Sequence, residues 1–164
     1  MPQPTDADAA PLVPGTVATH TGCLLLKLGQ VVFRISDERL SSLGLRVRHY
    51  SVLQALADNG SMSQLDLGAY LRIDAATMVS TLDTLEKAGY ARRVRDPQDR
   101  RRYVVELADP GRTVVASANE LLAEVDDLAF AELARAEREE LHTSLRKLAD
   151  GQALPRAFDE VRGG

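Results

Sequence analysis

Apolar residues recur at three- and four-residue spacing along most of the chain, and this period predicts a mainly helical protein. The first apolar stripe predicts a long helix over about residues 18–40, and a second helix follows over about 48–58. Near the other end, the turn at Asp109–Gly111 opens a second long helix of about 25 residues. A final amphipathic helix ends near Gly151.

The middle of the chain has a different pattern. Residues 63–71 and 74–88 are two short amphipathic segments, with a capping-box-like start at Ser63 and an N-cap at Asp74. Residues 90–95 and 102–107 alternate apolar with polar positions and flank a turn at 96–99, which predicts a β-hairpin. A short strand at 61–63 is also compatible with the pattern. We therefore expect a helix-turn-helix followed by a hairpin wing.

These elements predict a fold that is mainly α with a small β wing. Residues 46–107 form the winged helix-turn-helix lobe, and residues 18–40 with 109–151 form a helical dimerisation lobe, within one domain spanning 18–151. The long helices carry more apolar surface than so small a lobe can cover, which favours a homodimer. Residues 1–17 hold four prolines and are predicted to be a flexible tail, and residues 152–164 a weakly structured one.

Positive charge is concentrated in the predicted wing. Six arginines between positions 92 and 102 face two aspartates, a local net charge of +4 in a chain whose total is −4. A solvated surface would also tolerate such a run. However, a hairpin tip rich in guanidinium groups beside a helix with a small-residue face is typical of a helix in the major groove and a wing along the phosphates.

The run DPQDRRRYVVEL, which follows LEKAGY, resembles the wing of the multiple antibiotic resistance regulator (MarR) family of transcription factors. The resemblance extends from about Gly22 to Ala149. It implies a homodimer on a palindromic DNA operator, most simply a repressor. It also implies that Arg101 at the wing tip enters the minor groove and that Asp99 holds its guanidinium group.

The candidate DNA contacts lie on three elements. Hydroxyls of the second short helix can meet base edges or phosphates, and its alanine methyls can touch thymine. Relatives often carry an arginine at the position of Ser80 or Thr84. Because this chain has none there, we expect its sequence preference to depend more on DNA shape, read by Arg101. Ser63 and Gln64 either bind phosphate or only cap their helix. The full set is Ser63, Gln64, Ala75, Ala76, Thr77, Ser80, Thr81, Thr84, Arg92, Arg95, Asp99, Arg100, Arg101 and Arg102.

An effector site is also expected, because relatives bind phenolic or other small anions between the dimer helices and the DNA-binding lobe. The basic residues at the entry to the second helix could meet such an anion or serve only as surface and capping groups. Cys23 could sense an oxidant, or it could be a small buried hydrophobe. The candidate set is Cys23, Lys27, Arg46, Arg48 and His49.

Composition and the lack of known motifs argue against an enzyme, a metal-binding protein and a membrane protein. One cysteine and three histidines give no metal-ligand spacing, and we find no nucleophile, phosphate-loop or dinucleotide motif. We therefore expect no enzyme, no metal and no cofactor. The lack of a signal peptide or a long apolar run predicts a cytoplasmic protein with no membrane partner. The rival hypothesis is a winged-helix module that binds another protein instead of DNA.

Overall fold

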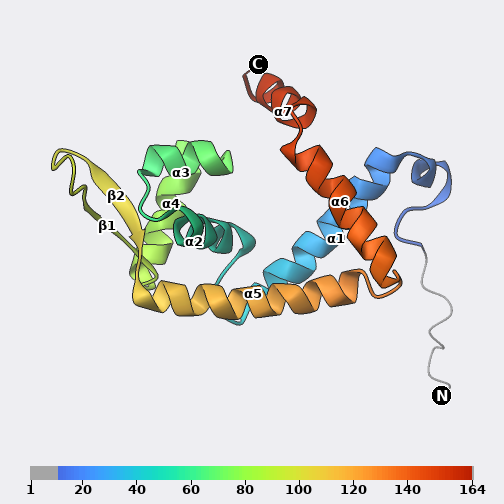
Figure 1. Cartoon of the computed structure of the whole chain (residues 1–164), viewed down its shortest axis with the longest axis horizontal. Coiled ribbons are helices and arrows are strands. Elements are labelled where there is room, and N and C mark those ends of the chain that lie inside the picture. Colours follow the sequence, from blue (N-terminus) through green and yellow to red (C-terminus); the bar gives the residue numbers. More distant parts are fainter. Residues whose placement is uncertain (1–10, 164) are drawn as a thin grey trace. The chain divides into compact units, whose positions relative to one another are not determined.

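The computed structural model describes residues 11–163, and the chain divides after Val125 into two compact units. Residues 1–10, most of the predicted N-terminal tail, lie outside the described part. Figure 1 shows the elements of both units. Within 11–163 none of the helices is both long and apolar enough to cross a membrane.

The N-terminal unit contains the winged helix-turn-helix (Figure 1). It begins with a short 3₁₀ helix, Gly15–Thr19, so that the end of the predicted tail is ordered. Its other elements are α1 (Thr21–Ser41), α2 (Val47–Asn59), α3 (Gln64–Leu71), α4 (Ala75–Lys87), β1 (Ala91–Arg95), β2 (Tyr103–Leu107) and most of α5 (Asp109–Ala129). The predicted order of helices and strands is confirmed, with ends that differ by one to a few residues.

Local chemistry fixes the limits of the helix-turn-helix. The Ser63 hydroxyl accepts the Asp66 N–H at 3.1 Å, and Asp74 Oδ1 accepts the Thr77 N–H at 2.9 Å, so both helices have the expected N-caps. Arg72 adopts a left-handed conformation with φ of 52° between them. Gly89, with φ of 75°, follows α4 and lets the chain turn into β1.

One buried cluster holds α2, α3, α4 and the hairpin together. It draws on aliphatic residues of each element, among them Leu53, Leu56, Leu67, Met78, Leu82, Leu85, Val105 and Leu107. The apolar stripes predicted for the helix-turn-helix and the hairpin are therefore the faces that pack here.

The hairpin is antiparallel, with Arg92 opposite Glu106 and Val94 opposite Val104. Residues 91–107, which we call the wing, project from the helical cluster (Figure 1). Met62 exchanges backbone hydrogen bonds of 3.1 and 2.8 Å with Val105, so the short strand expected at 61–63 is an isolated bridge.

The C-terminal unit holds the end of α5, then α6 (Arg135–Asp150) and α7 (Ala153–Gly163). The helix α7 corrects the expectation of weak structure over 152–164. Leu154, Phe158 and Val161 follow i, i+4, i+7 spacing, an amphipathic pattern too short to stand out in the sequence.

Candidate nucleic-acid interface

The outer side of α4 exposes most of the residues predicted to face DNA. Ala75, Ala76, Ser80 and Thr84 are exposed and Thr77 is half-buried. Thr81 is the exception, because only 2% of it is exposed and its hydroxyl donates to the Thr77 carbonyl at 2.7 Å. It lies one turn from Met78 and Leu85, on the packed side of the helix. The prediction that Thr81 contacts DNA is therefore wrong.

Two exposed residues of the same side, Val79 and Asp83, were missed from the sequence. Val79 follows Ala75 by four residues and Ala76 by three, a spacing that places them near one another. It was overlooked because a β-branched apolar residue is more often buried. The helical spacing from the two alanines was the available signal.

Arg93 joins the wing to α4, the second helix of the helix-turn-helix, which we call the recognition helix. Its guanidinium donates to Asp83 Oδ1 at 2.9 Å and to Glu86, and its backbone N–H donates to Glu86 Oε1 at 2.7 Å. A longer contact of 3.4 Å reaches Gln64 Oε1 in α3. Its side chain is only 26% exposed. Arg93 therefore neutralises carboxylates of α4, and it draws the predicted DNA contact Gln64 into the same cluster.

Arg92 lies on the opposite face of the hairpin. It pairs with Glu106, its cross-strand neighbour, while 68% of its side chain stays exposed. Strand alternation thus divides the arginines between the two faces of the wing.

The wing tip is shaped by its own polar groups. The Arg95 guanidinium lies 4.3 Å from the centre of the Tyr103 ring and donates to the Arg100 carbonyl at 2.9 Å. Asp96 Oδ1 accepts the Gln98 N–H at 2.8 Å, which tightens the turn. Arg95 therefore supports the loop that carries the remaining arginines.

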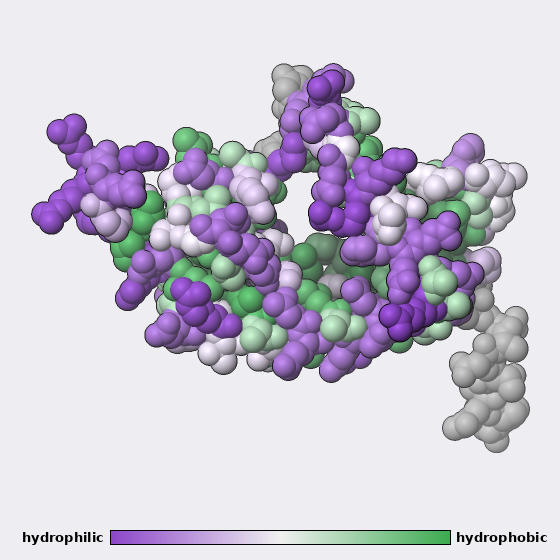
Figure 2. All heavy atoms as spheres, viewed as in Figure 1, coloured by the Kyte–Doolittle hydropathy of each residue, from purple (hydrophilic) through white to green (hydrophobic). Residues whose placement is uncertain are grey.

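Asp99 contacts Arg101 in a different way from that implied by the family resemblance. Its Oδ1 accepts the backbone N–H of Arg101 at 3.0 Å, and its carbonyl accepts the Arg102 N–H at 2.9 Å. Asp99 thus orients the backbone at the tip, and the Arg100, Arg101 and Arg102 side chains are exposed. Figure 2 shows the resulting hydrophilic projection.

Ser63 has a clear capping role. Besides accepting the Asp66 N–H, its hydroxyl donates to the Asp66 carboxylate at 2.5 Å. The first backbone N–H groups of α3 remain suited to an anion such as a phosphate.

The predicted effector residues do not form one cluster. Cys23, which is half-buried, and Lys27 lie in the first half of α1, whereas Arg46 is bound to Asp37 near its end. At a rise of about 1.5 Å per residue, the ten residues from Lys27 to Asp37 span about 15 Å. The structure therefore separates the two halves of the predicted set.

Arg46 and His49 instead build the start of α2. Asp37 accepts the Arg46 guanidinium at 2.7 Å and the Val47 N–H at 2.9 Å, and His49 Nδ1 accepts the Arg46 N–H at 3.2 Å. The bond from Val47, aided by Arg46, lowers the pKa of Asp37. Burial, with a smaller effect of the neighbouring Arg48, lowers the pKa of His49. This arrangement keeps the imidazole neutral and able to accept the hydrogen bond.

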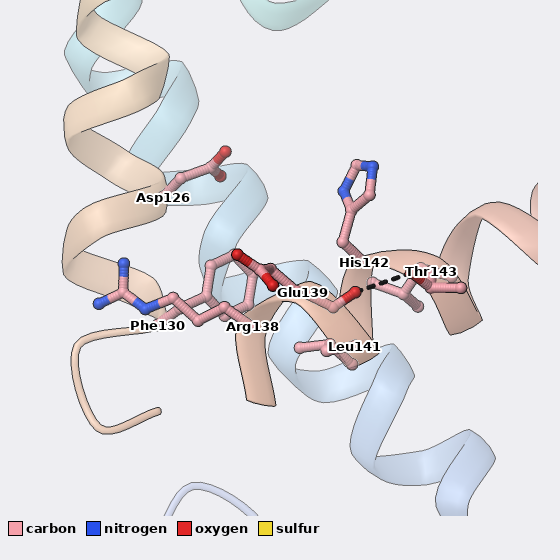
Figure 3. A pocket seen from close by; sticks show the side chains of 8 residues that line it. Asp126, Phe130, Arg138, Glu139, Leu141, His142 and Thr143 are labelled. Atoms are coloured by element: carbon pink, nitrogen blue, oxygen red, sulfur yellow. Dashed lines mark hydrogen bonds between the residues drawn. The ribbon is translucent and has the colours of Figure 1, made fainter. Parts of the chain in front are cut away.

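The C-terminal unit has a separate hollow of about 440 Å³ (Figure 3). Asp126 borders it from the end of α5 and Phe130 from the turn that follows, and the other lining residues come from α6. Phe130, Leu141 and Leu145 give it an apolar lining, with Arg138, Glu139 and His142 among its polar groups.

Known proteins resemble this chain in both sequence and fold. The model of the MarR family matches residues 43–102. A putative transcriptional regulatory protein for the hcr operon of Thauera aromatica is 31% identical over 148 residues, which cover 89% of each protein.

Two solved structures extend the comparison. The transcriptional repressor CouR, bound to a 23-mer DNA duplex, has a TM-score of 0.75 at 30% identity and covers 82% of this chain and 96% of its own. BpsR of Bordetella bronchiseptica, whose DNA binding is regulated by 6-hydroxynicotinic acid, has a TM-score of 0.72 at 28% identity. The match covers 85% of this chain and 99% of BpsR. With its exposed recognition helix and arginine-rich wing, the chain belongs to the MarR family of winged-helix, DNA-binding transcription regulators.

Proposed function

We propose that this protein is a homodimeric repressor that binds a palindromic operator and releases it when a small anionic effector binds. One observation carries the proposal: the exposed side of α4 and the arginine-rich wing tip belong to the same compact unit. The relative CouR is a repressor and was solved on DNA. This similarity supports a repressor function for this chain.

The proposed docking uses each part of the interface differently. The outer side of α4 carries small residues, which let the helix enter a major groove about 12 Å wide. Arg101 at the wing tip enters the neighbouring minor groove, and Arg100 and Arg102 contact phosphates. The N-terminus of α3, at Ser63 and Gln64, adds a phosphate contact.

A second copy of the chain would cover apolar surface that a monomer leaves in water. In the N-terminal unit, α1 exposes Leu25, Leu26, Leu28 and Phe33. In the C-terminal unit, Leu128, Leu145 and Leu148 are exposed, and Leu145 lines the apolar hollow described above. A dimer would place two recognition helices one turn of DNA apart, about 34–36 Å.

The effector in this proposal is an aromatic or phenolic anion. The relative BpsR responds to 6-hydroxynicotinic acid, which carries both a carboxylate and a hydroxylated ring. In this chain the exposed Arg48 lies at the entry to α2, beside the Arg46–Asp37 pair and His49, and α2 packs against the recognition helix. An effector bound there would shift the DNA-binding lobe only if the effector binds more tightly to one position of the lobe than to another.

Fluorescence anisotropy with the DNA upstream of the protein's own gene tests this function. We expect tight binding that weakens steeply as salt rises, a stoichiometry of two chains per duplex, and release by an aromatic carboxylate such as 6-hydroxynicotinic acid. A folded protein that binds no DNA at low salt, either upstream or in a random duplex pool, would support the protein-interaction module instead. Binding that no aromatic anion relieves would contradict the effector part alone.

A further inference from the structure

The outer side of α4 lacks the side chains that usually identify purines. Residues 75–84 contain no lysine, arginine, asparagine or glutamine, the types that form bidentate contacts with guanine or adenine. Instead, Val79 is 41% exposed between Ala75, Ala76 and Ser80. This places an aliphatic side chain on the outer side of α4, among small neighbours that leave it accessible to the floor of a groove.

The hydroxyl groups of this side are already engaged as donors. Ser80 donates to the Thr77 carbonyl at 3.0 Å, and Thr84 donates to the Ser80 carbonyl at 2.9 Å. Each hydroxyl has a single proton, so while these bonds hold both oxygens offer lone pairs toward DNA. Asp83 is likewise an acceptor, and Arg93 already binds it. The polar atoms of this side therefore suit base N–H donors and not the acceptors of guanine.

An A·T pair offers both complementary groups in the major groove. Its thymine carries a 5-methyl group and its adenine an N6 amino donor. A G·C pair also offers a donor, the cytosine N4 amino group, but it has no methyl group, so the thymine methyl is the feature that an aliphatic side chain can distinguish. We propose that Val79 is a specificity-determining residue that contacts thymine 5-methyl groups, so that α4 selects A·T pairs at the centre of each half-site. This inference rests on the proposed recognition of DNA by α4.

Thymine-to-deoxyuridine exchange tests the contact, since it removes one methyl group and leaves the base pairing intact. The full-length protein first selects duplexes from a randomised pool, and each thymine of the selected sequence is then replaced in turn. We expect A·T pairs at the half-site centre and a loss of about fourfold in affinity at one or two symmetric positions. Val79→Ala should lose about three- to tenfold on the thymine duplex and become insensitive to the same exchanges.

The control is Val161→Ala, the same change at an exposed valine of α7, which should keep the methyl dependence. Val79→Ala should fold normally, because alanine favours a helix more than valine does. A Val79→Ala variant as sensitive to deoxyuridine as the wild type, or methyl-independent binding at every position, would overturn the inference while leaving DNA recognition intact. Failure to select any duplex would overturn the proposed function as well.

Discussion

At the residue scale, the arginines of the wing differ in role although the sequence makes them look alike. Arg93 is mostly buried between Asp83, Glu86 and Gln64, whereas Arg92 pairs with one carboxylate at the surface. An arginine that joins two elements stabilises the fold, and an exposed one contributes mainly to the surface potential.

Replacing Arg93 should therefore cost more stability than replacing Arg92. Arg93→Ala leaves the carboxylates of Asp83 and Glu86 without their shared partner, and we expect a loss on the order of 1–3 kcal/mol in the free energy of unfolding. Arg92→Ala is the matched control and should cost less than about 1 kcal/mol, because its ion pair is exposed. Urea denaturation measures both. Equal losses would contradict the joining role of Arg93.

His49 links the stability of α2 to pH. Its pKa is lowered in the folded protein by burial, so the unfolded chain binds the proton more readily. The stabilisation is complete above the ordinary histidine pKa near 6.5 and is lost as pH falls through the lowered value. The Arg46 and Arg48 charges oppose protonation and Asp37 favours it, and the pKa of Asp37 lies below its ordinary 3.8.

We accordingly expect the Tm of the wild type to fall between pH 7.5 and 5.5 relative to that of His49→Gln. Glutamine can still accept the Arg46 N–H but does not titrate in this range. His20 and His142 are present in both proteins, so differential scanning calorimetry of the pair isolates His49. Parallel Tm curves would show that the His49 imidazole has no part in the acid sensitivity.

At the element scale, close backbone packing joins α5 to the residue before β1 and to the end of β2. Gly111 lies in the first turn of α5, where an added methyl group would meet the Tyr90 carbonyl and the Leu107 side chain. The Ala108 N–H donates to the same carbonyl at 3.0 Å. The absence of a side chain at Gly111 is therefore what allows α5 to start beside the wing.

Gly111→Ala should destabilise the protein by about 1–3 kcal/mol, because overpacking outweighs the gain in helix propensity. Arg112→Ala, an exposed change in the same turn, should stay within about 0.5 kcal/mol. Thermal unfolding followed by circular dichroism compares the two. A Gly111→Ala protein as stable as the wild type would mean that this contact relaxes without cost.

The helices and the hairpin could be predicted because their stripes are long and their caps are explicit, as at Asp74 and Gly89. The role of Arg93 could not, because its carboxylate partners come from another element and only the folded chain brings them together. The prediction that Thr81 contacts DNA failed because a threonine can be buried once its hydroxyl donates to a carbonyl of the preceding turn. The family resemblance implied one effector site, but it could not show that Lys27 lies ten residues along α1 from Asp37, the partner of Arg46.

At the scale of the whole molecule, an acidic chain can bind DNA because its charges are unevenly distributed. The net charge is −4, yet the wing between positions 92 and 102 carries +4. Salt screens charges beyond about 8 Å under physiological conditions, so the phosphates respond to the wing and not to distant carboxylates. Binding then depends on a few arginines at one tip.

The most direct measurement compares the salt dependence of DNA binding for the wild type, Arg101→Ala and the control Arg156→Ala, an exposed arginine of α7. We predict that Arg101→Ala loses about tenfold in affinity and about one unit of the slope of log K against log salt, with fold and oligomeric state unchanged. Arg156→Ala should match the wild type. An Arg101→Ala protein with wild-type affinity and slope would contradict the assignment of the wing tip to DNA.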